Sequence, residues 1–402
     1  MLKDRQFDTI IIGAGAAGMI AGISAAQAKP KQNIAIIEKN WILGKKVLVT
    51  GNGRCNLTNV NLSPDKYYGE NTKCLHNIFN RFSADDTIKF FNKLDVKLKT
   101  ENDGRVFPIT DMSSTIVDAL SKELSQQKVK IYVNERLVKL IPDQDGWQVK
   151  TDKNIYETKS VIIATGGKSY PESGSTGDGY DIARQFGHRI IEPRPALVSL
   201  ELKSDLFKEL PGVKANVTIT LTAQRKVVKR STGEILFTHF GISGPIVLDL
   251  SRLINNNSEV SVNFMPELRK HEELNDLFRQ YPRKTFVNTL DTILPKKLCQ
   301  VLLNELKIDT EKQASHLTKN ENQLIFDKLT NWQLPIRGSR SFEESMVTAG
   351  GVSMDEINHR TMESLKAKGL YFAGEILDID GVSGGYNLQF AWSTGFIAGS
   401  SV

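Results

Sequence analysis

The sequence predicts an α/β protein whose main part is a Rossmann-like dinucleotide-binding domain, interrupted by a β-rich segment and a helical one. Three observations carry this prediction. A strand, a glycine turn and a helix follow one another at the N-terminus, further glycine turns follow apolar runs at 161–167 and 370–375, and the pattern changes between 191 and 340. A chain of 402 residues has the length of two or three domains.

The N-terminal segment reads as a complete βαβ unit. Residues 7–12 form the continuous apolar run typical of a strand buried on both faces of a parallel sheet, and GAGAAG follows at once. An alanine-rich helix over 14–28 and a second buried strand over 33–37 complete the unit. The glycines break the apolar run, which argues against a signal peptide. Since no segment has about 18 uninterrupted apolar residues, we expect no membrane span and a cytoplasmic protein.

Local signals place several elements in the next part of the chain. Ser83 with Asp86 predicts a capped helix through about residue 94, and Asp111 is the expected N-cap of a helix through about residue 127. Between these helices the sequence alternates around Asp-Gly at 103–104, which predicts a hairpin. Short strands are expected from 128 to 164.

The pattern changes from about residue 191. Short alternating runs with several prolines predict a small β-rich, barrel-like domain, and the segment after it is helical. After residue 341 the pattern of an apolar run followed by a glycine turn appears again. The dinucleotide-binding domain is therefore expected to be discontinuous. The expected domains are 1–190 plus 341–402 for cofactor binding, 191–265 plus about 333–340 for the β-rich domain, and 266–332 for the helical insertion.

Composition narrows the function classes. The 52 Lys and Arg outnumber the 46 Asp and Glu by a net charge of +6 that is spread along the chain, which weakens the case for a nucleic-acid partner. Three cysteines without a CxxC pair suit a reducing cytoplasm and argue against a disulfide framework and a zinc site. No Ser/His/Asp nucleophile set and no metal-ligand spacing is present, so no metal is expected.

The GAGAAG turn has the three glycines of a dinucleotide site. Gly13 permits the tight turn, Gly15 lets the backbone approach a pyrophosphate, and Gly18 lets the helix pack on the strand. Glu38 follows about twenty positions later at the end of the second strand, where a carboxylate accepts hydrogen bonds from both ribose hydroxyls. The alternative is a glycine turn in an α/β unit that binds nothing.

The GAGAAG turn alone does not distinguish an NAD site from an FAD site. FAD is favoured by further glycine turns after buried runs, in VIIATGG and LYFAGE, and by a further helix start at SGGYNLQ. A flavin cofactor with two phosphates needs several such turns and helix N-termini to hold it. Ordinary strand-to-loop transitions are the alternative. Because no second GxGxxG follows a strand, either NAD(P)H docks transiently or another protein supplies the electrons.

The motifs together resemble a known family. GAGAAGM, LGKKVLVTGNGRCNLTN, DGRVFP, IIATGGKSYPESGSTGDGY, GEILFTHFGISGP and GLYFAGEILDIDGVSGGYNLQFAWSTG span nearly the whole chain. The sequence resembles the BaiN/YhiN-type bacterial NAD(P)/FAD-dependent oxidoreductases. The resemblance implies an FAD domain of the two-dinucleotide-binding-domains type with a β-rich second and a helical third domain. It also implies NAD(P)H as donor and, in some members, reduction of a conjugated double bond in a steroid-like ketone.

This resemblance locates the loop 44–56 over the FAD pyrophosphate and ribityl chain. Lys45 or Lys46 would offset phosphate charge, and the N–H groups of 51–54 would donate to the cofactor. The residues expected to contact FAD are Gly13, Ala14, Gly15, Ala16, Ala17, Gly18, Glu38, Lys39, Gly44, Lys45, Lys46, Gly51, Asn52, Gly53, Arg54, Cys55, Asn56, Leu137, Ala164, Thr165, Gly166, Gly167, Gly374, Glu375, Asp380, Gly384, Gly385, Tyr386, Asn387 and Leu388.

Cys55 lies in this loop without a second cysteine nearby, so a redox dithiol is not expected. Two interpretations stay open: a small side chain packed beside the flavin, or a reactive thiol or covalent flavin link.

Reduction of a double bond needs a proton donor as well as a hydride. His239 and Tyr170 are the candidate donors, and Arg54 is a candidate for stabilising negative charge on the reduced flavin or the substrate. Each donor has a structural alternative: a hydrogen-bonded histidine in a β-rich loop and a packed tyrosine.

Three function hypotheses follow. The leading one is an FAD-dependent oxidoreductase that takes hydride from NAD(P)H and reduces a small organic acceptor such as a conjugated enone. The second is a flavin-dependent RNA-modifying or RNA-binding protein. The third is a non-catalytic module that holds FAD.

Overall fold

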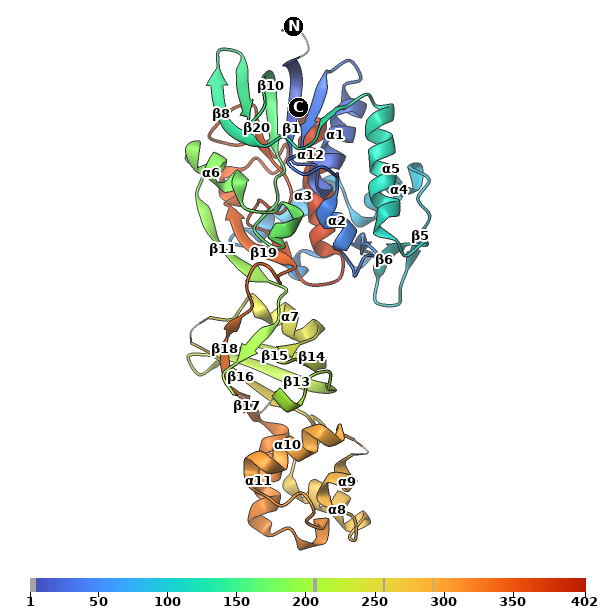
Figure 1. Cartoon of the computed structure of the whole chain (residues 1–402), viewed down its shortest axis with the longest axis vertical. Helices are drawn as coiled ribbons and strands as arrows, with labels where there is room; N and C mark the ends of the chain where they lie inside the picture. The colour runs from blue at the N-terminus through green and yellow to red at the C-terminus, as the bar shows by residue number, and fades with distance from the viewer. Residues whose placement is uncertain (1–4, 205–207, 256, 292) are drawn as a thin grey trace. The chain divides into compact units, whose positions relative to one another are not determined.

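The computed structural model describes residues 5–204, 208–255, 257–291 and 293–402. The chain forms two compact units, one of residues up to 195 together with 346–402, and one of residues 196–345. Figure 1 shows the blue N-terminal and red C-terminal segments within the same unit.

The first unit is built on a seven-stranded sheet with the order β7-β2-β1-β10-β9-β8, in which β20 also pairs with β10. β1, β2, β7, β10 and β20 run parallel, whereas β9 pairs antiparallel with both β10 and β8. The carboxyl ends of the parallel strands therefore meet at one edge, where open α/β sheets bind ligands. The strands are β1 (Gln6–Ile12), β2 (Ile34–Ile37), β7 (Lys130–Tyr132), β8 (Leu137–Asp143), β9 (Gly146–Thr151), β10 (Ile155–Ile163) and β20 (Leu370–Phe372).

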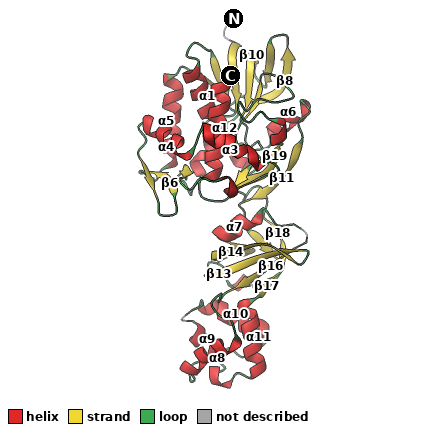
Figure 2. Ribbon diagram, turned by 180° about the vertical axis from the view of Figure 1, so that it is seen from behind, coloured by secondary structure: helices red, strands yellow, loops and turns green. Residues whose placement is uncertain are grey.

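Helix α12 (Tyr386–Ser401), from the end of the chain, packs directly on α1 (Ala16–Ala28), as Figures 1 and 2 show. Glycines make this contact possible. A Cβ on Gly395 would lie 2.3 Å from the carbonyl oxygen of Ala17, and one on Gly399 would lie 2.2 Å from that of Ala21. The N-terminal and C-terminal segments of the chain thus share one core.

Smaller elements surround this sheet. They are α2 (Lys45–Val49), β3 (Thr58–Asn59), β4 (Tyr67–Tyr68), α3 (Leu75–Arg81), α4 (Ala84–Lys93), β5 (Leu98–Thr100), β6 (Arg105–Pro108), α5 (Ser113–Gln126), α6 (Asp178–Gln185), β11 (Ile190–Ala196), β19 (Val347–Val352) and β21 (Asp380–Gly381). The capping box of Ser83 and Asp86 is confirmed, and so is the β5–β6 hairpin around Asp-Gly. The predicted N-cap Asp111 is wrong: Met112 is the N-cap of α5, because the Asp111 carboxylate is bound to Arg54 and Lys99 instead.

The second unit contains a seven-stranded sheet with the order β17-β16-β13-β14-β15-β12-β18 and antiparallel neighbours. Pro335 alone separates β17 from β18, the two strands at the ends of this order. One residue spans only about 7 Å between its neighbours, so the sheet curves until its ends meet, as a barrel does. The strands are β12 (Leu200–Leu202), β13 (Lys214–Ala223), β14 (Lys226–Phe237), β15 (Gly241–Ser243), β16 (Ser258–Asn263), β17 (Trp332–Leu334) and β18 (Ile336–Ser339).

Helices complete the second unit. They are α7 (Pro245–Ser251), α8 (His271–Gln280), α9 (Phe286–Leu290), α10 (Lys296–Leu306) and α11 (Lys319–Thr330). Their apolar faces share a core with the curved sheet, in which Trp332 and Phe286 are fully buried. Across the described parts of both units, no helix is long and apolar enough to span a membrane.

Candidate functional site

The glycine turn at the end of β1 shows a different physical need at each glycine. Gly13 has a φ of +100°, and a Cβ there would lie 2.6 Å from the carbonyl oxygen of Ala164. A Cβ on Gly18 would lie 1.8 Å from the carbonyl oxygen of Gly13, so only glycine lets α1 approach the turn. At Gly15, by contrast, a Cβ would have no described heavy atom within 4 Å. The turn is tightly packed on one side and open at the N-terminus of α1.

Glu38 is tied to this turn. Its Oε2 accepts a hydrogen bond of 2.7 Å from the backbone N–H of Ala14, and its Oε1 accepts two of 2.8 Å from the backbone and side chain of Asn40. The side chain is buried. These bonds fix a carboxylate at the end of β2, beside the glycine turn.

The loop that follows α2 has an unusual backbone. Gly51, Asn52, Gly53 and Cys55 all have positive φ, and the loop is held from outside because Ser113 donates to the carbonyl oxygens of Gly53 (2.8 Å, from N) and Leu48 (2.6 Å, from Oγ). The N–H groups of Gly53 and Arg54 bond to carbonyl oxygens inside the loop. The prediction that they donate to a cofactor is therefore not supported for these two residues.

Arg54 is bound by two carboxylates. Its guanidinium lies 2.7 Å from Glu101 and 2.7 Å from Asp111, and 3.9 Å above the ring of Phe107. The hydrogen bonds to Glu101 and Asp111 raise the pKa of Arg54 above its usual value. Because its charge is balanced locally, the structure favours a role in anchoring the loop to the β5–β6 hairpin over the predicted charge stabilisation at the reaction centre.

Lys46 joins a polar cluster built from three strand ends. Its Nζ lies 2.6 Å from Glu375 Oε2, after β20, and 2.6 Å from Ser169 Oγ, after β10. Glu375 Oε1 also accepts hydrogen bonds from Ser169 Oγ (2.5 Å) and from the backbone N–H of Thr348 (2.8 Å). The side chains of Lys46 and Glu375 are only 22% and 20% exposed. Sequence reasoning missed Ser169 and Thr348, because neither has a local signal.

The other predicted lysines point elsewhere. Lys39 binds Thr176 and Asp178, and Lys45 donates to the carbonyl oxygen of Glu172 at 2.5 Å. All three partners belong to the segment after β10. These lysines therefore tether that segment, and among the three predicted lysines Lys46 is the one in the cluster with Glu375.

Glycines also shape the loops after β10 and β20. Gly166 has a φ of +75°, and a Cβ on Gly167 would lie 2.3 Å from Thr348 Oγ1. The hydroxyl of Thr165 is buried without a hydrogen-bond partner in the described residues. Gly374 has a φ of +82° and donates to Thr394 Oγ1 of α12 at 2.9 Å. Of the predicted alanines, Ala164 follows β10 directly, and Ala16 and Ala17 are the first two residues of α1.

The N-terminus of α12 is the last part of the site. Gly384 and Gly385 have φ values of +120° and +100°, and a Cβ on Gly385 would lie 2.5 Å from the carbonyl oxygen of Thr58. The Asn387 side chain fixes the preceding loop, because it accepts a hydrogen bond from the N–H of Gly381 (2.8 Å) and donates one to the carbonyl of Gly381 (2.9 Å). The carbonyl of Tyr386 accepts from the Tyr67 hydroxyl at 2.8 Å. Three other predicted contact residues lie nearby. The Asn56 amide lies between Thr58 and Gly385, Asp380 is buried in β21, and Leu388 is partly buried.

We call residue 38 together with the segments 13–18, 44–56, 164–167, 374–375 and 384–388 the cofactor cradle. Two helix N-termini and four parallel strand ends gather there, an arrangement that suits an extended, doubly phosphorylated cofactor. The open space at Gly15 fits such a group. Leu137 is the first residue of β8, two residues after Glu135, whose N–H donates to the carbonyl of Glu38.

Cys55 is fully buried, and burial raises the pKa of its thiol to about 12. A thiol with that pKa is protonated at neutral pH and a poor nucleophile. Of the two interpretations left open by the sequence, the structure favours the packed side chain.

The two predicted proton donors lie in different units. Tyr170, in the loop after β10, is partly exposed with a φ of +53°, and no described residue bonds its phenol. His239, between β14 and β15 of the second unit, is exposed and has no polar partner among the described residues. Both side chains are thus available for a ligand.

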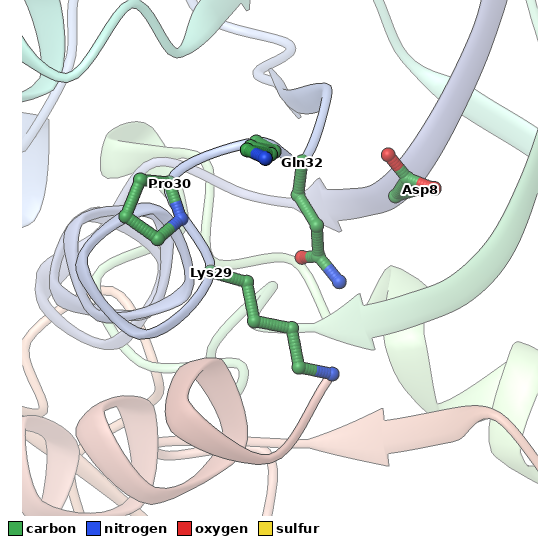
Figure 3. Close-up of a pocket in the computed structure, with 5 residues that line it drawn as sticks. Asp8, Lys29, Pro30 and Gln32 are labelled. Atoms are coloured by element: carbon green, nitrogen blue, oxygen red, sulfur yellow. The ribbon is translucent and has the colours of Figure 1, made fainter.

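A shallow surface cavity lies at the opposite end of α1 (Figure 3). It is lined by Asp8, Lys29, Pro30, Lys31 and Gln32. Asp8 is already bound to Lys159 at 2.7 Å. The cavity is therefore not part of the cofactor cradle, which lies at the carboxyl ends of the strands.

Residues 7–401 match the model of a family described as the HI0933-like protein Rossmann domain. The chain belongs to this family. The match confirms the resemblance that the motifs indicated and the predicted fold class, an α/β protein with a Rossmann-type FAD-binding domain.

Similar curated proteins cover nearly the whole chain. A 3-dehydro-bile acid delta(4,6)-reductase from Clostridium scindens is 36% identical over 97% of this chain and 97% of its own length. A ribosomal RNA dihydrouridine synthase from Escherichia coli is 34% identical over 97% and 96%. A protein of the same name from Haemophilus influenzae is 31% identical over 98% of both chains.

Solved structures share the fold at low identity. An Escherichia coli quinol fumarate reductase FrdA variant superposes with a TM-score of 0.52 at 16% identity, covering 98% of this chain and 69% of the other. A 3-ketosteroid delta1-dehydrogenase from Sterolibacterium denitrificans superposes with a TM-score of 0.50 at 12% identity, covering 98% and 99%. At this identity the likeness concerns the fold alone.

Proposed function

We propose that the protein is an FAD-dependent oxidoreductase that takes hydride from NAD(P)H and reduces a carbon–carbon double bond conjugated to a carbonyl group. We place it in the cytoplasm, since its three cysteines are unpaired. The cofactor cradle supports the FAD assignment because its open space lies at the N-terminus of α1, a position that favours a diphosphate.

The observation that carries this proposal is the shared chemistry of the three relatives. A delta(4,6)-reductase of a 3-dehydro steroid acts on double bonds conjugated to a ketone. Dihydrouridine is uridine with two hydrogens added across C5=C6, a bond conjugated to the C4 carbonyl, and two relatives carry the name of that product. Both names thus describe the addition of two hydrogens across a carbon–carbon double bond conjugated to a carbonyl group. The reaction type is therefore the part that we transfer to this chain, ahead of either substrate.

The residues of the cradle have distinct proposed roles. The turn 13–18 would hold the diphosphate at the N-terminus of α1, and Glu38 would accept from ribose hydroxyls after exchanging its present partner Asn40. The ammonium of Lys46, which has three N–H donors and bonds Glu375 and Ser169, would donate its third hydrogen bond to the cofactor. When bound, FAD supplies the hydride-transferring ring.

A proton must also reach the acceptor. Tyr170 and His239 remain the proposed donors. Neither side chain has a described polar partner, so each is available to donate a proton to the acceptor.

The test is a visible spectrum of the purified full-length protein, followed by anaerobic addition of NADH and then NADPH. Bound flavin bleached by either nucleotide, and reoxidised by an acceptor with a conjugated enone or by uridine-containing RNA, is the expected result. Flavin that ignores both nucleotides would indicate a protein electron donor or a non-catalytic module. Reduced flavin that neither acceptor reoxidises faster than a saturated ketone would contradict the proposed reaction.

RNA is the second candidate acceptor. The two relatives named for ribosomal RNA favour it. A steroid-like enone is the first, supported by the relative with 36% identity.

A further inference from the structure

The end of the β13–β14 hairpin gathers positive charge that the rest of the chain spreads out. Arg225, Lys226, Lys229 and Arg230 fall within six positions, and each is exposed. Among the described residues, none of these four cations has an ion-pair partner. The nearest described ion pair on the hairpin joins Lys214 to Glu234 at its other end.

The backbone holds these cations on a rigid tip. Gln224 and Arg225 have φ values of +50° and +63°, as in a type I′ turn, and Ala223 pairs directly with Lys226. The register shifts between Leu221 and Thr222, which leaves Val228 as an extra residue on β14. From Lys226 to Arg230 the strand covers about 10 Å, because the paired segment from Ala223 to Thr220 rises by three residues. That length spans neighbouring phosphates of a nucleic-acid strand.

Protection of a strand edge explains only part of this pattern. Among the described residues, β15 pairs with Leu236 and Phe237 of β14 alone, so the part of β14 before them has no neighbour on that edge. Lysine there discourages pairing with another sheet. Four cations are more than protection of the strand edge requires. Val227 and Val228 are also 59% and 46% exposed, which adds apolar surface that edge protection would avoid.

The adjoining sheet face supplies hydroxyl groups. Arg230 pairs with Thr220 and so shares a face with Thr218 and Thr222, the alternate residues of β13. Thr218 and Thr232 hydroxyls lie 2.8 Å apart across the strands. Phosphate and sugar oxygens are recognised by arginine, lysine and hydroxyl side chains of this kind.

We propose that this cationic hairpin, residues 224–230, binds the sugar-phosphate backbone of RNA. The inference rests on the second candidate acceptor, RNA, but not on the redox chemistry, because the hairpin belongs to the second unit and the cofactor cradle to the first. It also qualifies the expectation from composition that positive charge is spread along the chain, since four of the 52 Lys and Arg fall within six positions here.

The experiment compares two variants of the flavin-loaded full chain. The hairpin variant carries Arg225→Gln, Lys226→Gln, Lys229→Gln and Arg230→Gln. The control carries Lys31→Gln, Lys73→Gln, Lys139→Gln and Lys153→Gln, four exposed lysines of the first unit without a described ion pair. Both lose four positive charges, so non-specific attraction changes equally. Binding to a fluorescent structured RNA is measured by anisotropy from 50 to 300 mM salt.

The hairpin variant should bind at least tenfold more weakly at 150 mM salt, and its slope of log affinity against log salt should fall by about 3. The control should stay within about threefold of the unaltered chain. Equal weakening of both variants, or no RNA binding by the unaltered chain at 50 mM salt, would overturn the proposal. So would binding to phosphatidylserine vesicles, but not RNA, that depends on the hairpin.

Two further readouts separate this proposal from the proposed function. Reduction of a small enone by the hairpin variant should equal that of the unaltered chain, which also shows that the variant folds. Hairpin-dependent RNA binding without any uridine reduction would remove RNA as acceptor and leave the RNA-binding surface in place.

Discussion

Lys46 Nζ and Glu375 Oε2 lie 2.6 Å apart, although 329 positions separate the two residues in the chain. Lys46 comes from α2, after β2, and Glu375 follows β20. Ser169, after β10, bonds to both. The pair therefore connects three strand ends of the discontinuous first unit at the edge where we place the cofactor.

Replacing Lys46 with Met should weaken FAD binding by about tenfold, because one charge-assisted contact contributes about 1–2 kcal/mol. Thermal stability should fall as well, because both side chains are only about one-fifth exposed and Glu375 loses its cation. Lys45→Met is the control, because Lys45 bonds a backbone carbonyl outside the cluster. Fluorescence titration of apoprotein with FAD measures the effect. Equal losses in both variants would argue against a specific role for Lys46.

Two alanine substitutions should separate folding from cofactor binding in the glycine turn. Gly15→Ala adds a methyl group to open space, so stability should hold while FAD binding falls at least tenfold. Gly18→Ala puts a Cβ 1.8 Å from a carbonyl oxygen and should cost about 3 kcal/mol or more of unfolding free energy. Thermal unfolding of the apoproteins and flavin content measure the two effects. Normal flavin content in the Gly15→Ala protein would place the cofactor elsewhere.

The three cysteines should be inert in the folded protein. Burial raises the pKa of Cys55, Cys74 and Cys299 to about 12 in each case. Ellman's reagent at pH 8 should find almost no thiol before unfolding and all three afterwards. Acid precipitation should release all of the flavin. Rapid labelling of Cys55, or flavin retained in the pellet, would restore the reactive-thiol interpretation.

His188 should make stability depend on pH. Its ring is buried, its Nε2 lies 2.7 Å from Ser364 Oγ, and its Nδ1 lies 3.2 Å from Glu356. Desolvation lowers the pKa of His188, an effect that the charge of Lys366 strengthens and that of Glu356 opposes. The ring is therefore neutral in the folded state at neutral pH. The unfolded chain takes up a proton below about pH 6.5, so the stability that His188 contributes is present above that pH and is lost as pH falls.

Urea unfolding between pH 7 and pH 5 measures this slope, which for one proton is at most about 1.4 kcal/mol per pH unit. His188→Gln should flatten it. The pKa of the Glu356 carboxyl is lowered, so the stability that Glu356 contributes is lost only below about pH 4.5, outside the measured range. An unchanged slope in the variant would mean that other groups cause it.

Tyr170→Phe and His239→Gln should identify the proton donor. Loss of the true donor should slow acceptor reduction by about a hundredfold and leave flavin reduction by NAD(P)H unchanged. Stopped-flow measurement of the two half-reactions separates these steps. If neither variant slows acceptor reduction, the proton comes from water or from another side chain.

Local sequence patterns predicted much of the first unit. The turn GAGAAG, the capping box at Ser83 and the Asp-Gly hairpin each depend on neighbours a few positions away, and the structure has all three. Asp111 shows the limit of such patterns. It has the residue type of an N-cap, but two cations distant in the chain bind its carboxylate.

Arg54 shows the same limit at the candidate site. Its sequence context next to glycines and Cys55 indicates a ligand loop, whereas its ion pairs with Glu101 and Asp111 depend on how the β5–β6 hairpin folds back. The sequence by itself determined the family, the fold class and the glycine turn, because these follow from periodicity and short spacings. Only the tertiary structure decided which charges meet, including Lys46 with Glu375, because ion pairs depend on distances between segments that hundreds of residues separate.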